Sequence, residues 1–194
     1  GNQEQILKET LDISNIPRQE DVSSIPVWKN IDKEQMKKYL SHEMSFYLSQ
    51  GCKFNCHFCQ AIKGGPEIYR KTDIAAEDLE WLTKKAISFG IYELSIYFSN
   101  LDIFQSPFAL EKFIDRILEI KRKHDFTYKL RALAVVESTL EVDEKILNKF
   151  KEAGLVSIGV GADGATAAAW KQSNKKQKIK KNKKEAEIKM ITDS

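Results

Sequence analysis

The sequence predicts an α/β fold: a partial (β/α) barrel with parallel strands and about four βα units. Two observations carry this prediction. From Met44 onward, short apolar runs alternate with amphipathic segments of helical period, which is the pattern of parallel strands joined by helices. The 194 residues are 42% hydrophobic, which is enough for one domain with a real core.

Residues 1–43 precede the regular alternation and are expected to form a leader or connector that packs on the domain. Pro26 disfavours helix at the residue before it, so the middle of this segment is expected to be extended. A short amphipathic piece follows over 33–40, and Trp28 and Ile31 are the expected anchors on the domain.

The first βα unit begins with an apolar run over 44–50, which predicts a strand. A helix is expected over 73–89, because apolar residues recur there at helical spacing. Thr72 or Asp73 is its expected N-cap and Gly90 its stop.

The remaining elements repeat this alternation. The sequence predicts strands over 93–98, 127–136 and 155–160, a helix opened by Pro107, and a helix over 143–153 that ends at Gly154. Right-handed crossovers between such strands give a parallel sheet whose carboxyl ends meet at one mouth. Four strands do not close a barrel, so an edge must stay open, be covered by the leader or tail, or pair with missing sequence.

Residues 44–170 therefore form the predicted partial barrel, and residues 171–194 a lysine-rich, flexible tail. The tail has nine lysines against three carboxylates, which leaves a net charge of −3 on residues 1–170. Because the basic character belongs to the tail alone, the body offers no nucleic-acid groove, and a nucleic-acid partner is not expected.

No stretch is apolar enough to suggest a membrane span or a signal peptide. An odd number of cysteines packed together argues against a disulfide framework and for a reducing compartment, so we expect a cytoplasmic protein. The chain also lacks an initiator Met, which suggests an excised or processed piece.

All three cysteines, Cys52, Cys56 and Cys59, lie in one polar loop immediately after the first predicted strand. Such spacing is not a packing pattern, because a cysteine that only fills space has no reason to lie near another. Three thiolates can bind three irons of a [4Fe–4S] cluster and leave the fourth iron without a protein ligand. Electron-transfer clusters usually take four cysteines, and this chain has no fourth.

A structural zinc site of the Cys₃His type is the main alternative, with His57 or the distant His42 or His124 as the fourth ligand. Adjacent Cys56 and His57 can hardly both point at one tetrahedral ion, which argues against His57. The remaining alternative, three thiols without a metal, requires a coincidence of spacing.

The segment Cys52-Lys53-Phe54-Asn55-Cys56-His57-Phe58-Cys59, placed after the first strand of a βα series, resembles the radical S-adenosylmethionine (radical SAM) superfamily. The resemblance implies a [4Fe–4S] cluster held by the three cysteines, with SAM chelating the fourth iron. It also implies reductive cleavage of SAM to methionine and a 5′-deoxyadenosyl radical that abstracts a substrate hydrogen. An electron donor such as flavodoxin or ferredoxin is then a partner. No catalytic residue beyond the cluster is expected.

The same resemblance suggests further cofactor-binding residues. Phe58 matches the aromatic residue that lies against the SAM adenine, although simple loop packing also accounts for it. Ser99 and Asn100 follow the second strand, where the family often has a Gly-Gly-Glu-like turn that meets the SAM amino group; a turn or cap role is equally open. Asp163 stands where the family has a polar group near SAM, and its alternative role is a helix N-cap.

Other features are weaker pointers. Arg131 and the pair Tyr69-Arg70 are candidates, but arginines at such places more often form rim salt bridges. The turn from Tyr97 to Asp102 departs from the Gly-Gly-Glu form and resembles that of cobalamin-binding-type members, as does the connector from Ile25 to Asp32. If that subgroup is right, cobalamin binds in a domain that is not present here, and this chain is an excised catalytic core.

Two functions therefore stand side by side. The first is a radical SAM enzyme acting on an unknown substrate. The second is a non-catalytic module in which a Cys₃ zinc or iron–sulfur site is structural and the basic tail contacts nucleic acid or a protein partner. Because an incomplete barrel would expose SAM to solvent, the first predicts weak or uncoupled turnover for this piece.

Overall fold

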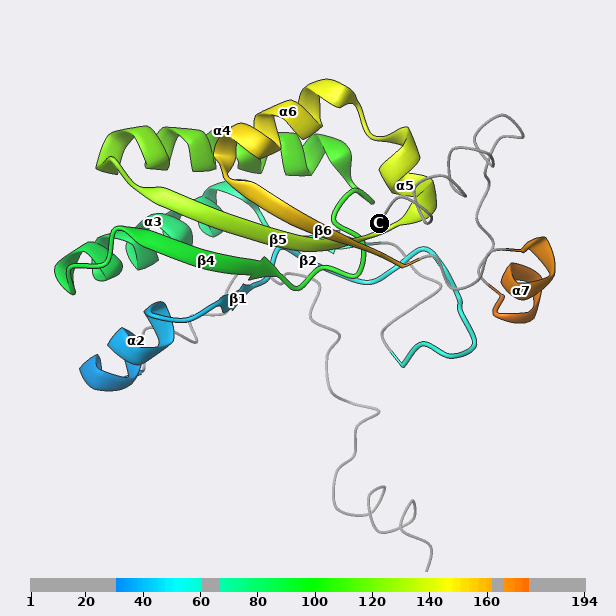
Figure 1. The fold of residues 1–194 in the computed structure, drawn as a ribbon, viewed down its shortest axis with the longest axis horizontal. Coiled ribbons are helices and arrows are strands. Elements are labelled where there is room, and N and C mark those ends of the chain that lie inside the picture. Colours follow the sequence, from blue (N-terminus) through cyan, green and yellow to red (C-terminus); the bar gives the residue numbers. More distant parts are fainter. Residues whose placement is uncertain (1–30, 61–66, 162–165, 175–194) are drawn as a thin grey trace, which may run out of the picture.

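The computed structural model describes residues 31–60, 67–161 and 166–174. Its centre is a four-stranded parallel sheet in the order β1-β4-β5-β6 (Figure 1). The strands are β1 (Met44–Phe46), β4 (Glu93–Phe98), β5 (Thr127–Val135) and β6 (Leu155–Gly161). Strands alternate with helices along the chain, so the predicted α/β class with parallel strands is confirmed.

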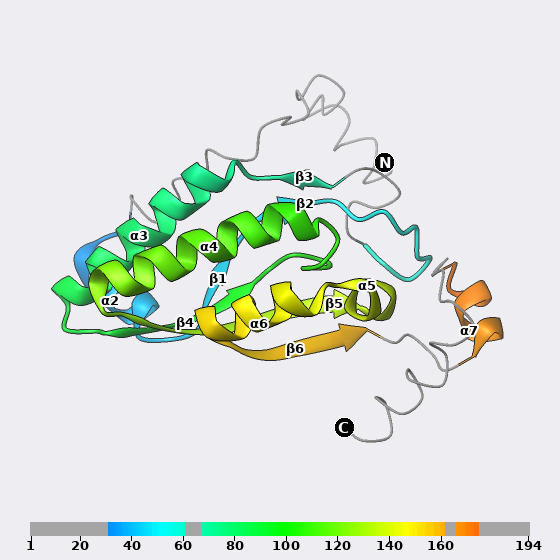
Figure 2. The same cartoon turned by 90° about the horizontal axis from the view of Figure 1, so that it is seen from above.

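Three helices cover one face of this sheet: α3 (Thr72–Ser88), α4 (Pro107–His124) and α6 (Glu144–Ala153), as Figure 2 shows. The strands turn alternate side chains towards them, among which Leu94, Ile96 and Phe98 of β4 are buried. Phe113 of α4 stacks on Phe46 of β1 with ring centroids 5.8 Å apart. The buried residues of α4 recur at helical spacing: Leu110, Phe113, Ile114, Ile117, Leu118 and Ile120.

The prediction of one strand over 44–50 was wrong. Only β1 joins the main sheet, and β2 (Ser49–Gln50) pairs antiparallel with β3 (Ile68–Tyr69), a strand that the sequence did not suggest. Arg70 is the physical reason. Its side chain donates to the Tyr47 carbonyl (3.1 Å) and its backbone N–H to the Leu48 carbonyl (2.7 Å), so both groups are drawn away from the main sheet.

Two local features also differ from the prediction. The N-cap of α3 is Lys71, not Thr72 or Asp73, so Asp73 instead lies in the first turn, where its charge complements the helix dipole. The polar residues 137–139, which follow the predicted strand over 127–136, belong to the short helix α5 (Val136–Glu141), which was not predicted. Gly90 and Gly154 end their helices as predicted, both with positive φ.

Two short helices lie at the ends of the described chain. Helix α2 (Lys33–Leu40) begins after Asp32, whose side chain accepts from the Gln35 N–H, and buries Met36 and Leu40. Helix α7 (Ala167–Gln172) follows β6 and is capped by Thr166. The predicted leader up to residue 30, including Trp28, and the tail from residue 175 lie outside the described residues, as does Asp163.

The other face of the sheet carries exposed side chains, including Lys129, Arg131 and Leu133 of β5. Arg131 pairs with Glu43 at 3.2 Å, which agrees with its interpretation as a rim salt bridge. In a complete barrel this face would line the interior. Within the described ranges, no helix has the length and apolar character needed to span a bilayer.

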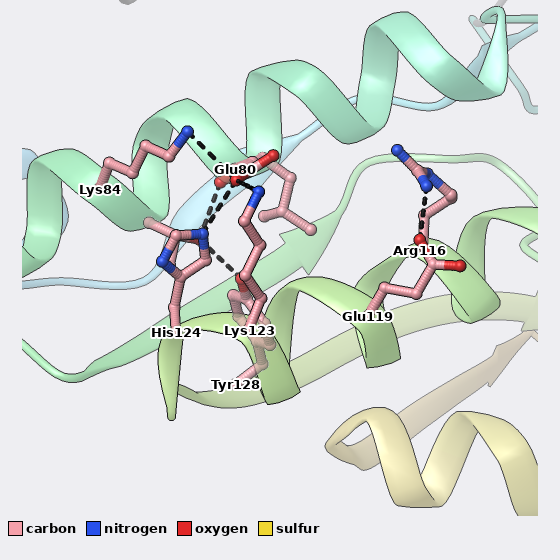
Figure 3. A network of polar contacts seen from close by, with 9 residues as sticks. Glu80, Lys84, Arg116, Glu119, Lys123, His124 and Tyr128 are labelled. Carbon is pink, nitrogen blue, oxygen red and sulfur yellow. Dashed lines mark hydrogen bonds and ion pairs between the residues drawn. The ribbon is translucent and has the colours of Figure 1, made fainter.

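A polar cluster joins α3 to α4 away from the carboxyl ends of the strands. Figure 3 shows Lys84, Lys123 and His124 converging on the carboxylate of Glu80, with Nζ and Nε2 atoms 2.8 to 3.1 Å from Oε1. Hydrogen bonds from Lys123, His124 and Lys84 lower the pKa of Glu80 to about 2. The charged form of this carboxylate therefore stabilises the packing of the two helices.

Glu80→Gln is expected to lower the free energy of unfolding by about 1 kcal/mol near neutral pH, the upper range for partly exposed ion pairs. Because the pKa of Glu80 is lower in the folded protein than in the unfolded chain, the stabilisation is complete above the ordinary carboxyl pKa. It disappears as the pH falls towards about 2. Urea unfolding of both proteins between pH 7 and pH 3 checks this. If the difference in free energy of unfolding between the parent and Glu80→Gln grew as the pH fell, the prediction would be contradicted.

Candidate metal centre

The cysteine loop, residues 51–60, reaches the carboxyl end of the parallel sheet. Cys56 is buried in a small apolar cluster with Phe54 and Val135, the last residue of β5. Cys52 and Cys59 are half-buried and pack against the same cluster. The fold thus gathers the three thiols in one place, next to the end of a central strand, as the loop's position in the sequence predicted.

Burial and neighbouring charges act together on the Cys52 thiol. Burial raises the pKa of the Cys52 thiol above its ordinary value, and the charges of Asp102, Cys56 and Cys59 add to the effect. A hydrogen bond from the Phe54 backbone acts in the opposite direction. Burial and nearby negative charges both disfavour the charged thiolate form of a cysteine.

In the part of the chain that the structure describes, no three His, Cys, Asp or Glu side chains are arranged to hold a single metal ion. A cubane cluster does not need that arrangement, because each cysteine binds a different iron. The three thiols with their partly apolar surround are a donor set that an iron–sulfur cluster can use.

The loop is also held from its outer side. The His57 N–H donates to the Ser173 carbonyl (2.9 Å), and Asn174 Nδ2 donates to the Asn55 carbonyl (2.7 Å). Both contacts come from the end of α7, which lies at the same end of the molecule as this loop in Figures 1 and 2. The sequence did not suggest this contact, because it joins residues more than one hundred positions apart.

Among the other predicted residues, Phe58 has 58% of its surface exposed, so its ring is accessible at the loop and is not used in the core. Ser99 follows β4, and its N–H donates to the Phe46 carbonyl (3.1 Å), which continues the pairing of β4 with β1. Arg70 is buried and pairs with Asp78 at 2.5 Å, so it has a structural role.

Asn100 is 2% exposed, and its Nδ2 donates to Ser49 Oγ at 2.5 Å. Ser49 and Ser106 both donate to the carboxylate of Glu67, so the turn after β4 is tied to the β2–β3 ribbon. The carbonyl oxygen Oδ1 of Asn100 is buried, and within the described ranges it accepts no hydrogen bond. A buried acceptor that receives no hydrogen bond is unfavourable in a folded protein.

Asp102 was missed as a site residue, although the sequence places it in the same turn. It is 2% exposed, and its Oδ1 accepts from Ser138 Oγ (2.6 Å) and from the N–H groups of Phe104 and Val135 (3.3 and 3.4 Å). Burial raises its pKa, and these hydrogen bonds oppose the rise. Its Oδ2 is buried and accepts no hydrogen bond from any described residue. The sequence did contain a signal for Asp102. It lies in the turn after β4, and β4 pairs with β1, the strand that precedes the cysteine loop.

Comparison with known proteins agrees with this arrangement. The family model described as "Radical SAM superfamily" matches residues 46–189. Among solved structures, one that is similar is titled "Structure of Cobalamin-dependent S-adenosylmethionine radical enzyme OxsB with aqua-cobalamin and S-adenosylmethionine bound", with a TM-score of 0.58 and 16% identity. The match covers 69% of this chain and only 20% of that one, and at this identity it shows the fold alone. No curated protein sequence matches.

Proposed function

Because this chain belongs to the radical SAM superfamily, whose model matches it over residues 46–189, we propose that it binds a [4Fe–4S] cluster and cleaves SAM reductively. The grouping of Cys52, Cys56 and Cys59 against one apolar cluster at the end of β5 is the observation that carries the proposal.

In this proposal the three cysteines hold the cluster as thiolates, and Phe54 and Val135 limit the access of water to it. A bound cluster of this kind supplies the electron that splits SAM into methionine and a 5′-deoxyadenosyl radical. The protein binds and orients SAM and keeps water away from the reacting atoms. A reductant such as flavodoxin or ferredoxin is the partner that this chemistry needs.

Orientation of SAM is assigned to the turn after β4. The two buried acceptors there, Asn100 Oδ1 and Asp102 Oδ2, receive no hydrogen bond from the described residues, and the SAM ammonium group offers three donors. Ser99 belongs to the same turn. The exposed ring of Phe58 is the surface proposed for the adenine, which stacks on aromatic side chains. Asp163, outside the described residues, stays in the proposal as a further SAM contact.

Asn100→Ala is expected to weaken SAM binding by roughly tenfold, because a hydrogen bond to a charged group contributes about 1.5 kcal/mol or more. Ser49→Ala is the matched control, because it removes the hydroxyl that Asn100 donates to while keeping Asn100 Oδ1 in place. Equilibrium dialysis of reconstituted protein with SAM measures both dissociation constants. Equal weakening in the two variants would show that Asn100 acts only through the ribbon.

Anaerobic reconstitution with iron and sulfide tests the function itself. The expected result is a brown protein with about four irons per chain that forms 5′-deoxyadenosine and methionine from SAM after reduction with dithionite. Tight binding of zinc without SAM binding would overturn the proposal in favour of a structural metal module.

The cobalamin-binding subgroup is the finer assignment that we propose. It rests on the resemblance of the turn from Tyr97 to Asp102 and of the connector from Ile25 to Asp32 to that subgroup. The similar solved protein is cobalamin-dependent by its title, and this chain spans 20% of that protein. The gene sequence on either side of the segment checks this, because a cobalamin-binding domain would then be encoded upstream.

A further inference from the structure

Lys53, between the first two cysteines, connects the loop to two other parts of the molecule. Its backbone N–H donates to Gln105 Oε1 (3.0 Å), in the segment between β4 and α4. Its Nζ donates to Glu137 Oε1 (2.9 Å), in the first turn of α5. A single residue thus ties the cysteine loop to the segments that follow two central strands.

Glu137 is a well-fixed partner for this contact. Its side chain is 10% exposed, against 45% for Lys53, so the carboxylate is held by the protein and the lysine comes to it. The neighbouring Ser138 donates to Asp102 Oδ1 (2.6 Å), which also accepts from the Val135 N–H. The first turn of α5 is therefore fixed to the turn after β4 by a buried carboxylate.

The same turn also supports the loop through apolar contact. Val135, which immediately precedes α5, packs against Phe54 and Cys56. The Lys53 ammonium lies 5.0 Å from the centre of the Phe54 ring. The backbone N–H of Lys53, its ammonium group and the Phe54 ring therefore all anchor the short stretch 52–56, which contains two of the three thiols.

The Lys53–Glu137 ion pair differs from the exposed lysine–glutamate pair on the sheet. Lys129 and Glu93, for example, lie 2.7 Å apart, but their side chains are 54% and 44% exposed and both belong to strands. Such a pair contributes little, because water screens it and nothing depends on its geometry. The Lys53–Glu137 pair has one buried member and joins an irregular loop to a helix, so its loss changes where the loop lies.

We propose that Lys53 and Glu137 are positioning residues that clamp the cysteine loop onto α5 and so set the arrangement of the three thiols. That the loop binds a cluster rests on the proposed function. The clamp itself exists without metal and is tested without it. The failure of one proposal can therefore be told from the failure of the other.

The first test is hydrogen exchange of metal-free protein, read at the peptide containing residues 52–59. Lys53→Met and Glu137→Gln are expected to exchange about fivefold faster there, the factor that corresponds to the upper end of energies for partly exposed ion pairs. Lys129→Met is the matched control and should leave this peptide unchanged. Lys53→Arg, which keeps the charge, should restore protection. Exchange at the parent rate in both Lys53→Met and Glu137→Gln overturns the clamp.

The second test is made on protein reconstituted with iron and sulfide. Loss of iron to a chelator should be faster in Lys53→Met and Glu137→Gln, and the electron paramagnetic resonance spectrum of the reduced cluster should change in both and return in Lys53→Arg. Faster loop exchange with an unchanged spectrum and iron release would overturn the positioning role. If no variant, nor the parent, assembles a cluster, the proposed function fails while the exchange result still decides the clamp.

Discussion

Cys56→Ala is expected to abolish cluster assembly and, with it, SAM cleavage. The loss should be on the order of a thousandfold, well beyond the 10- to 100-fold effect of removing an outer partner of a metal ligand. Cys56 is the most buried of the three thiols and packs against Phe54 and Val135, so no water or neighbouring thiol easily takes its place. Iron content, the absorbance of the reconstituted protein and the yield of 5′-deoxyadenosine measure the effect.

His57→Ala is the control that separates an iron–sulfur cluster from zinc. The His57 side chain is exposed, and the hydrogen bond that this residue makes to Ser173 uses its backbone N–H, which alanine retains. A cluster held by three cysteines should therefore survive the change with nearly the parent iron content. A Cys₃His zinc site that uses His57 would lose its metal in both variants. A Cys56→Ala protein that still cleaves SAM at the parent rate would contradict the proposed ligand set.

Gly154→Ala is expected to destabilise the protein by on the order of 3 kcal/mol, combining a disfavoured backbone conformation with a steric clash. Gly154 ends α6 with φ of 122°, a region that side chains rarely allow. A Cβ built there would lie 2.1 Å from the Tyr128 carbonyl oxygen of β5, which is too close for any contact. Neither atom can move away freely, because the Cβ is fixed to the backbone at residue 154 and the oxygen belongs to the backbone of β5.

The site is sensitive because Gly154 joins two elements of the core. Its N–H donates to the carbonyls of Phe150 and Lys151 at the end of α6, and its carbonyl accepts from the Leu130 N–H (2.8 Å) of β5. The pairing of β5 with β6 shifts register at Leu130 and Arg131, immediately beside this contact. Relief of the clash would therefore disturb the start of β6 as well as the end of the helix.

Gly90→Ala is the matched control. Gly90 also has positive φ, 75°, but a Cβ there would have nothing within 4 Å. This variant should lose only about 1 kcal/mol, the cost of the left-handed conformation alone. Urea unfolding followed by circular dichroism gives both values. Similar losses in the two variants would mean that backbone conformation, and not the close approach to Tyr128, decides the effect.

Much of the fold was predictable from local patterns. The strand over 93–98 and the helix opened by Pro107 agree with β4 and α4, because alternation of period two and apolar spacing near 3.6 are properties of a short stretch of chain. The glycines that end α3 and α6 were predictable for the same reason. The cysteines were predictable as a group because their spacing is local.

The sequence by itself therefore determined the α/β class, most of the helices and strands, and which loop carries the thiols. Only the tertiary structure decided what supports that loop. The division of the first strand depends on Arg70, and the short helix α5 was not predicted. Asp102 and Glu137 become important through partners more than thirty residues away. Burial and hydrogen-bond satisfaction between distant segments fix these features, and neither can be read from neighbouring residues.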